Sequence, residues 1–154
     1  MEFTGDELAG VVDLFGALTP GELREGLAEL AYKQDGEYEP DSFEETVEAA
    51  INSYHLVRVD TEDEPLLVAG PGAFPMLPPE AGDLAHMLDI EERTVTRKTA
   101  GEAALDRFRT DAAAVVNEGD PERVKRLLDV SYELESWTDV DLSEERALLD
   151  RVLE

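Results

Sequence analysis

Cysteine is absent from this sequence, which excludes disulfide bonds, thiolate metal sites and cysteine nucleophiles. Long apolar runs are absent as well, because the longest span only a few residues and a membrane-crossing helix needs about 20. The N-terminus, MEFTGDELAG, has neither the basic nor the apolar segment of a secretory signal. We therefore expect a soluble, cytoplasmic protein with no membrane contact.

Positively charged residues are also scarce. The chain has 38 Asp and Glu residues against 13 Lys and Arg residues, which gives a formal net charge of −25. In dilute buffer this much like charge repels itself strongly, whereas in about 1 M salt the Debye length falls to about 3 Å and the repulsion is screened. Carboxylates also favour solubility more than amines do. The composition is typical of a protein from a very salty cytoplasm.

Sequence motifs of catalysis are also missing. The chain has no G-x-x-x-x-G-K-[ST] phosphate loop, no G-x-G-x-x-G and no G-x-S-x-G. Nothing near the only histidines, His55 and His86, has metal-ligand spacing, so a structural or surface role is the simpler interpretation. Asp139, Asp141 and Ser143 alternate as in a calcium loop, but the required glycine and glutamate are out of register. We expect a non-enzymatic protein without a cofactor or a metal.

The first half of the chain predicts three helices and a β-hairpin. Three capping boxes, Thr4–Glu7, Thr19–Glu22 and Ser42–Glu45, each precede apolar residues at helical spacing. Two short β-prone runs, 56–59 and 65–69, then flank a polar turn. Three helices followed by a hairpin is the order of a winged-helix domain. A generic α+β domain with one hairpin is the alternative.

The second half is predicted to be helical after an irregular, proline-containing stretch over 70–92, which holds a short helical turn near 81–88. A long helix is expected from about 94 to 117, or from the later capping box at Thr99. Two further helices follow, from Pro121 and from Ser143. We expect Trp137 and Tyr132 to close the core of these helices rather than to stack on a base.

The predicted fold class is therefore mainly α (α+β). A winged-helix-like domain of three helices and a β-hairpin occupies residues 1–79. A C-terminal helical region, 80–154, packs on it or mediates association.

The charge of the third predicted helix bears on its partner. Residues 42–54 contain Glu44, Glu45 and Glu48 but no Lys or Arg, and the hairpin turn is acidic too. DNA affinity comes mostly from Lys and Arg that neutralise phosphates, and Asn52 is the one plausible reader of base edges on this helix. We therefore expect a protein partner, with nucleic acid disfavoured and the oligomeric state open.

One segment departs from the acidic norm, between residues 93 and 109. Its five cations are a candidate surface for an acidic partner or a phosphate, and Arg123, Lys125 and Arg126 could extend it. The simpler interpretation is a helix surface of i,i+4 ion pairs. A DNA-binding transcription regulator that contacts DNA through this half is the alternative function. The five candidate residues are Arg93, Arg97, Lys98, Arg107 and Arg109.

Several segments carry a resemblance to a known group of proteins. They are FTGDELAGVVDLFGALTPGELREGLAELAY, HLVRV, DLAHMLDIE and GDPERVKRLLDVSYELESW. With them, the chain resembles an uncharacterised haloarchaeal protein family with a winged-helix-like N-terminal half. The resemblance covers most of the chain and implies a class of organism, but no activity and no catalytic residue. The function we expect is a non-enzymatic interaction or regulatory module of a halophilic archaeon, with the winged-helix fold used for protein contacts.

Overall fold

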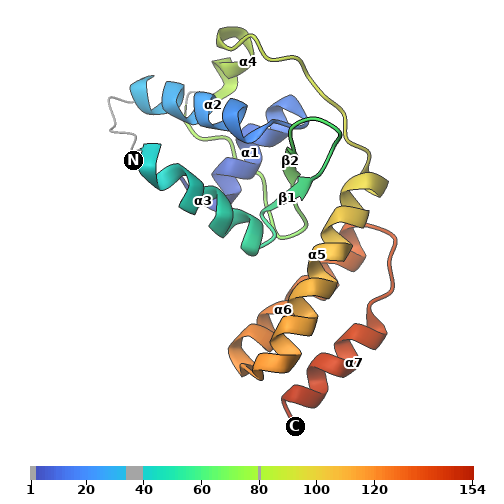
Figure 1. The fold of residues 1–154 in the computed structure, drawn as a ribbon. Coiled ribbons are helices and arrows are strands. Elements are labelled where there is room, and N and C mark those ends of the chain that lie inside the picture. The colour runs from blue at the N-terminus through green and yellow to red at the C-terminus, as the bar shows by residue number, and fades with distance from the viewer. Residues whose placement is uncertain (1–2, 34–39, 80) are drawn as a thin grey trace. The chain divides into compact units, whose positions relative to one another are not determined.

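A computed structural model of the chain is mostly helical with one small antiparallel sheet, which confirms the predicted fold class (Figure 1). It describes residues 3–33, 40–79 and 81–154. The chain divides into two compact units, Met1–Thr96 and Arg97–Glu154, and each is described by itself. Within the described residues, no helix is both long enough and apolar enough to cross a membrane.

The first unit ends later than the boundary expected at residue 79. Leu84 is fully buried in its core, and the backbone N–H of Arg93 donates to the carbonyl oxygen of Phe15 at 3.1 Å. These contacts place the segment after residue 80 with the first unit. The unit contains α1 (Gly5–Phe15), α2 (Pro20–Lys33), α3 (Pro40–Asn52), β1 (Leu56–Val59), β2 (Leu66–Ala69), a 3₁₀ turn (Ala81–Asp83) and α4 (Leu84–Met87).

Two of the three predicted capping boxes are confirmed. The backbone N–H of Thr4 donates to Glu7, and the N–H of Glu7 donates to the Thr4 hydroxyl. Thr19 and Glu22 repeat the arrangement at α2. The third prediction is wrong, because α3 begins at Pro40. Ser42 therefore lies inside the helix, where its carbonyl oxygen accepts from the Thr46 hydroxyl four residues later, at 2.9 Å.

The predicted hairpin is present, with β1 and β2 paired antiparallel from Leu56 opposite Ala69 to Val59 opposite Leu66. A third segment joins this sheet. Leu18, between α1 and α2, forms an isolated bridge with Leu67, and the two residues exchange backbone hydrogen bonds of 3.1 and 2.7 Å. The hairpin is thereby fixed to the chain between the first two helices.

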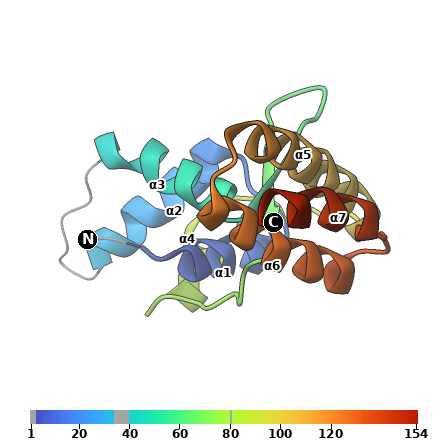
Figure 2. The same cartoon turned by 90° about the horizontal axis from the view of Figure 1, so that it is seen from below.

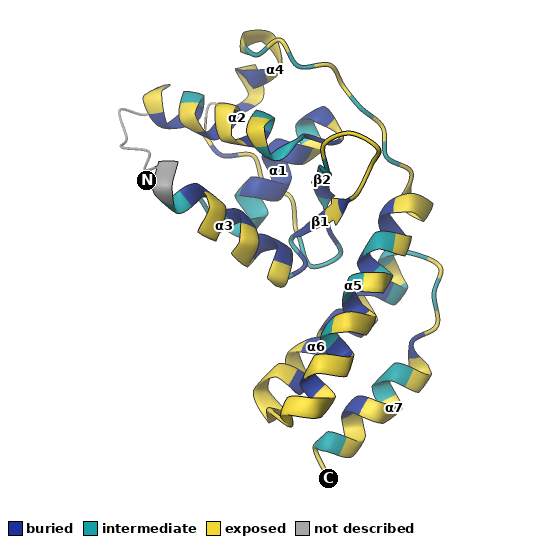
Figure 3. Ribbon diagram, in the orientation of Figure 1, coloured by how far each residue is buried: buried dark blue, intermediate teal, exposed yellow. Residues whose placement is uncertain are grey.

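The core of the first unit lies where α1, α2 and α3 face the hairpin and α4 (Figure 3). Its side chains follow the apolar spacing of each helix. Gly16 ends α1 with φ of 86°, a backbone conformation that glycine adopts without steric cost. The fully buried large side chains of this unit include Leu8, Phe15, Leu18, Leu23, Leu27, Leu30, Tyr54, Leu56, Leu67 and Leu84.

The second unit consists of three helices, α5 (Arg97–Glu118), α6 (Pro121–Trp137) and α7 (Ser143–Val152). They contact one another in all three pairs (Figures 1 and 2). Asp120 caps α6 by accepting the N–H of Glu122 at 3.1 Å. The core between the helices includes Phe108, Val115, Val124, Leu127, Leu134 and Leu149. The expected core role of Tyr132 is wrong, because that side chain is 60% exposed.

Candidate functional site

A groove of about 380 Å³ opens on the first unit between the start of α2, helix α3 and the hairpin. We call it the α3 groove. Its floor is apolar and includes Val47, Ile51 and Leu67, all of which are part of the core. Charged side chains stand at its rim, namely Arg24 from α2, Glu44 and Glu48 from α3, and Arg58 from β1.

The two rim arginines are held close to their own unit. The guanidinium of Arg24 lies 4.8 Å from the ring centroid of Phe43, and its Nη2 is 3.9 Å from Oε1 of Glu44. Nε of Arg58 donates to Oδ1 of Asp60 at 3.3 Å. Both cations are thus partly neutralised by neighbouring carboxylates, although these exposed contacts are weak ones.

The lining of the α3 groove holds two carboxylates and two cations, and further carboxylates lie in the neighbouring β1–β2 loop. On α3, the side chains of Glu44 and Glu48 are exposed. Residues 60–64 of the loop between β1 and β2 are exposed and include Asp60, Glu62, Asp63 and Glu64. An apolar floor beside the exposed carboxylates of α3 and of this loop suits an apolar side chain that is flanked by basic residues. It opposes a phosphate backbone, because like charges repel across such a contact.

Arg93 is the one member of the predicted cation surface that belongs to the first unit. Its guanidinium forms a two-pronged ion pair with Glu22, in which Nη2 donates to Oε2 at 3.0 Å and Nη1 pairs with Oε1. The hydrogen bond from Arg93 lowers the pKa of Glu22, and the same bond raises the pKa of Arg93. Glu22 also completes the cap of α2. Arg93 therefore fastens the 81–93 segment to α2.

The other four predicted cations lie on α5 in the second unit. Arg97 stacks over Trp137 with 4.4 Å from its guanidinium carbon to the ring centroid, and donates to the Trp137 carbonyl oxygen at 2.9 Å. Arg107 pairs with Asp111, one turn later, through Nε at 3.0 Å. Lys98 and Arg109 are exposed. The structure thus assigns three of the five residues to contacts within their own unit.

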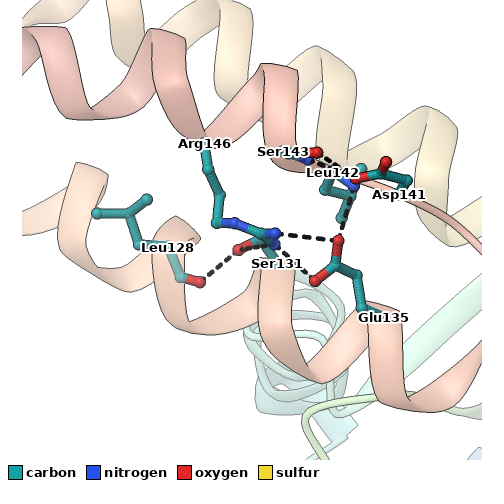
Figure 4. Close-up of polar contacts among 7 residues, drawn as sticks. All are labelled: Leu128, Ser131, Glu135, Asp141, Leu142, Ser143 and Arg146. Atoms are coloured by element: carbon teal, nitrogen blue, oxygen red, sulfur yellow. Dashed lines mark hydrogen bonds and ion pairs between the residues drawn. The ribbon is translucent and has the colours of Figure 1, made fainter.

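Sequence reasoning missed a polar network of the second unit that joins α6 to α7 (Figure 4). Arg146 on α7 donates to both carboxylate oxygens of Glu135 on α6, at 2.7 and 3.1 Å. Oε2 of Glu135 also accepts the backbone N–H of Leu142 at 2.8 Å. The guanidinium of Arg146 lies 4.4 Å from the ring centroid of Tyr132. Local sequence spacing does not predict the Arg146–Glu135 pair, because its members are 11 residues apart on different helices.

The network shifts the ionisation of its members. The hydrogen bond from Arg146 lowers the pKa of Glu135 and raises that of Arg146. The hydroxyl of Ser143 donates to Asp141 just before α7 and lowers the pKa of that carboxyl. These groups are therefore held in their charged forms, and they connect helices rather than face a ligand.

His55 lies in a small polar cluster at the end of α3, and His86 lies exposed in α4. Nδ1 of His55 is 2.5 Å from the hydroxyl oxygen of Ser53, and Nε2 is 3.5 Å from Oδ1 of Asp6. The Ser53 hydroxyl also lies 3.1 Å from the carbonyl oxygen of Ala50, to which it can donate. The cluster links the start of α1 to the turn before β1. In the described part of the chain, no three His, Asp or Glu residues are grouped to hold a metal ion.

Comparisons with known proteins give a family and no further relative. No curated protein and no solved structure matches the chain. Residues 6–154, which span both units, match a family of unknown function designated DUF7109. The chain therefore belongs to the DUF7109 family.

Proposed function

We propose that this chain is a non-enzymatic interaction module of a halophilic archaeon, and that it works in the cytoplasm. Its first unit binds a protein partner through the α3 groove. The observation that carries this proposal is the apolar floor of the groove beside the exposed Glu44 and Glu48 of α3, with both lining arginines already in contact with Glu44 and Asp60. The β1–β2 loop, which follows Arg58, adds further carboxylates outside the groove. The partner presents an apolar side chain between basic residues.

The order of elements supports a winged-helix interpretation of the first unit. Three helices precede the hairpin, and the isolated Leu18–Leu67 bridge ties the chain between α1 and α2 to β2. In this arrangement α3 is the recognition helix and the β1–β2 loop is the wing. DNA-binding proteins of the helix-turn-helix class place such a helix in the major groove. Here both contact elements are acidic, so the same geometry favours a basic protein surface.

The net charge of −25 supports a halophilic setting. At molar salt the Debye length is about 3 Å, so long-range attraction between charged surfaces is largely lost. Recognition then rests on close contacts, which an apolar floor provides. The charged rim selects among partners by penalising acidic ones.

The test is partner capture by a tagged chain expressed in a haloarchaeal host and purified in molar potassium chloride. The double variant Glu44→Gln, Glu48→Gln removes two rim charges without touching the buried floor. A matched control, Glu102→Gln with Glu154→Gln, removes the same charge from exposed positions of the second unit. Cross-linking and mass spectrometry then identify the proteins bound to each variant.

We expect the wild type and the control to recover the same basic protein, with cross-links to α3 or the β1–β2 loop, and the rim variant to lose it. Equal recovery by all three chains would contradict the proposal. Recovery of nucleic acid in place of protein would favour the alternative, a DNA-binding regulator.

A further inference from the structure

One basic side chain already lies on an aromatic ring in the α3 groove, and it belongs to the chain itself. Arg24 on α2 has its guanidinium carbon 4.8 Å from the centroid of the Phe43 ring. Its Nη2 lies 3.9 Å from Oε1 of Glu44, the next residue of α3. All three residues line the groove. Phe43 and Glu44 thus offer an aromatic ring beside a carboxylate, and we call these two residues the α3 platform.

A guanidinium suits the α3 platform better than an ammonium does. It is planar and weakly hydrated, so it stacks on a ring while its N–H groups donate to a carboxylate. A cation within about 6 Å of the ring centroid is attracted by the negative face of the ring. Stacking requires close contact, so it persists at molar salt, where a Debye length of about 3 Å screens longer-range attraction. The position of Arg24 indicates which chemistry the platform accepts.

The contacts that hold Arg24 on the platform are weak. Its side chain is 47% exposed and that of Glu44 is 86% exposed, and an ion pair between groups this exposed contributes little to stability. Their separation of 3.9 Å is also longer than a charge-assisted hydrogen bond, which measures about 2.7–2.9 Å. Another cation therefore displaces Arg24 at little cost.

Space for the displaced side chain lies one turn earlier on α2. Gly21 is exposed, and a β-carbon there would meet no side chain of the described residues within 4 Å. Long side chains of a helix lean toward the turn before their own, which directs Arg24 toward Gly21. Phe43 is only 4% exposed while Arg24 lies over it. A new cation therefore reaches this face of the ring when Arg24 has left.

We propose that the protein partner inserts an arginine onto the α3 platform, and that Arg24 is the internal competitor that this arginine displaces. The inference rests on the proposed function, and it narrows the basic residue of the partner to arginine. The local charge favours an incoming cation, because Glu48 is exposed one turn after Glu44. Arg24 also acts as a specificity determinant, since a ligand that stacks less well than a guanidinium does not replace it.

NMR titration in molar potassium chloride tests the proposal with two peptides of equal charge, acetyl-Arg-Leu-Arg-amide and acetyl-Lys-Leu-Lys-amide. The amide shifts of α3 give the dissociation constants, and the ring protons of Phe43 report contact with the platform. The chains compared are the wild type, Arg24→Gln and Arg58→Gln. Arg58→Gln is the matched control, because it removes the same charge from the same groove and Arg58 contacts Asp60.

We expect Arg24→Gln to bind the arginine peptide about two- to fivefold more tightly than the wild type does, the factor that matches the loss of one exposed cation–π competitor. Arg58→Gln should gain less, because molar salt screens the change in charge. On Arg24→Gln, the arginine peptide should bind more tightly than the lysine peptide and should shift the Phe43 ring protons further.

Two additional variants, made in the Arg24→Gln background, separate the ring from the carboxylate. Phe43→Leu keeps an apolar side chain at a buried position and should make the affinities for the two peptides equal, provided that circular dichroism shows native helix content. Glu44→Gln changes an exposed position and leaves the core intact. It should weaken binding of the arginine peptide.

Three results would overturn the proposal. They are equal gains in affinity in Arg24→Gln and Arg58→Gln, equal affinities of Arg24→Gln for the two peptides, and no saturable shift with either peptide. Each of them leaves partner capture by the α3 groove as a separate result, because capture does not depend on a choice between arginine and lysine. A failed capture with the arginine preference intact would instead overturn the proposed partner and leave the α3 platform standing.

Discussion

The two units of this chain use their charges differently. Residues 1–96 hold 23 acidic and 4 basic residues, a net charge of −19, whereas residues 97–154 hold 15 acidic and 9 basic residues, a net of −6. In the second unit, arginines pair with carboxylates or aromatic rings of the same unit, as Arg97, Arg107 and Arg146 do. In the first unit, carboxylates far outnumber the cations available to them.

The pairing of arginines within the second unit indicates that a cation-rich segment need not be a binding surface. Among the described residues, the second unit has 11 buried hydrophobic residues against 23 in the first. In this smaller core, Arg97 and Arg146 add contacts between helices. None of the described carboxylates of the first unit is buried. The proposed recognition surface therefore lies on the acidic unit. Four predictions test this difference between the two units, in order of decreasing expected effect.

The largest effect should come from the aromatic centre of each core. Phe15 in the first unit and Phe108 in the second are 2% and 0% exposed, and Phe→Ala at such sites costs about 3–5 kcal/mol. Trp137, the only tryptophan, reports unfolding of the second unit by fluorescence. Phe108→Ala should shift this transition, and Phe15→Ala should shift the far-UV dichroism more than the fluorescence. An unchanged fluorescence transition in Phe108→Ala would contradict the assigned core.

The Arg93–Glu22 pair should matter more than the Arg107–Asp111 pair. Arg93 joins a segment 71 residues away to Glu22, which also caps α2, so Arg93→Gln should lower the free energy of unfolding by about 1–3 kcal/mol. Arg107→Gln breaks a pair within one helix and should cost about 0.3–0.5 kcal/mol. Chemical denaturation followed by circular dichroism compares the two variants. Equal losses of unfolding free energy in the two variants would contradict the larger contribution expected from Arg93.

The α6–α7 network should make the second unit sensitive to acid. The folded-state pKa of Glu135 lies below its usual value of 4.5 because of the bond from Arg146. The resulting stability is present above pH 4.5 and is lost as the pH falls through the folded-state pKa. Urea midpoints followed by Trp137 fluorescence between pH 7 and pH 3 should fall steeply in the wild type.

Glu135→Gln should lower the midpoint at neutral pH and flatten the acid dependence. Glu102→Gln, an exposed substitution on α5, should leave both unchanged. If the urea midpoint of Glu135→Gln depended on pH as strongly as that of the wild type, other carboxylates would govern the acid transition.

A small effect should also come from Arg97, which stacks on Trp137 at 4.4 Å. An exposed cation–π contact contributes about 0.5–1 kcal/mol, so Arg97→Ala should destabilise by that amount and change the emission of Trp137. Lys98→Ala, at the neighbouring exposed position, is the control. If both variants behave alike, the stacking contact has no energetic role.

Most of the fold could be predicted from local signals. Thr4–Glu7, Thr19–Glu22 and Asp120–Pro121 mark helix starts through contacts within one turn, and such contacts are visible as sequence patterns. The start of α3 was misplaced, because Ser42–Glu45 has the same pattern two residues inside a helix that begins at Pro40. The pattern alone does not separate a cap from an interior position.

The long-range contacts could not be predicted in the same way. Arg93 with Glu22 and Arg146 with Glu135 are 71 and 11 residues apart, and only the packing of helices decides which carboxylate each arginine reaches. The Leu18–Leu67 bridge is equally non-local. Within the α3 groove, the acidic character of α3 was evident from the sequence. That Arg24 and Arg58 border it follows only from the fold.

DNA binding by the first unit provides the most direct test of the account. A fluorescently labelled DNA duplex is titrated with the chain, at the lowest salt that preserves native helix content, because low salt strengthens any phosphate contact. The account predicts no saturable rise in anisotropy, in the wild type or in Arg24→Gln with Arg58→Gln. A saturable rise that this double variant abolishes would show that the α3 groove binds nucleic acid, and would contradict the account.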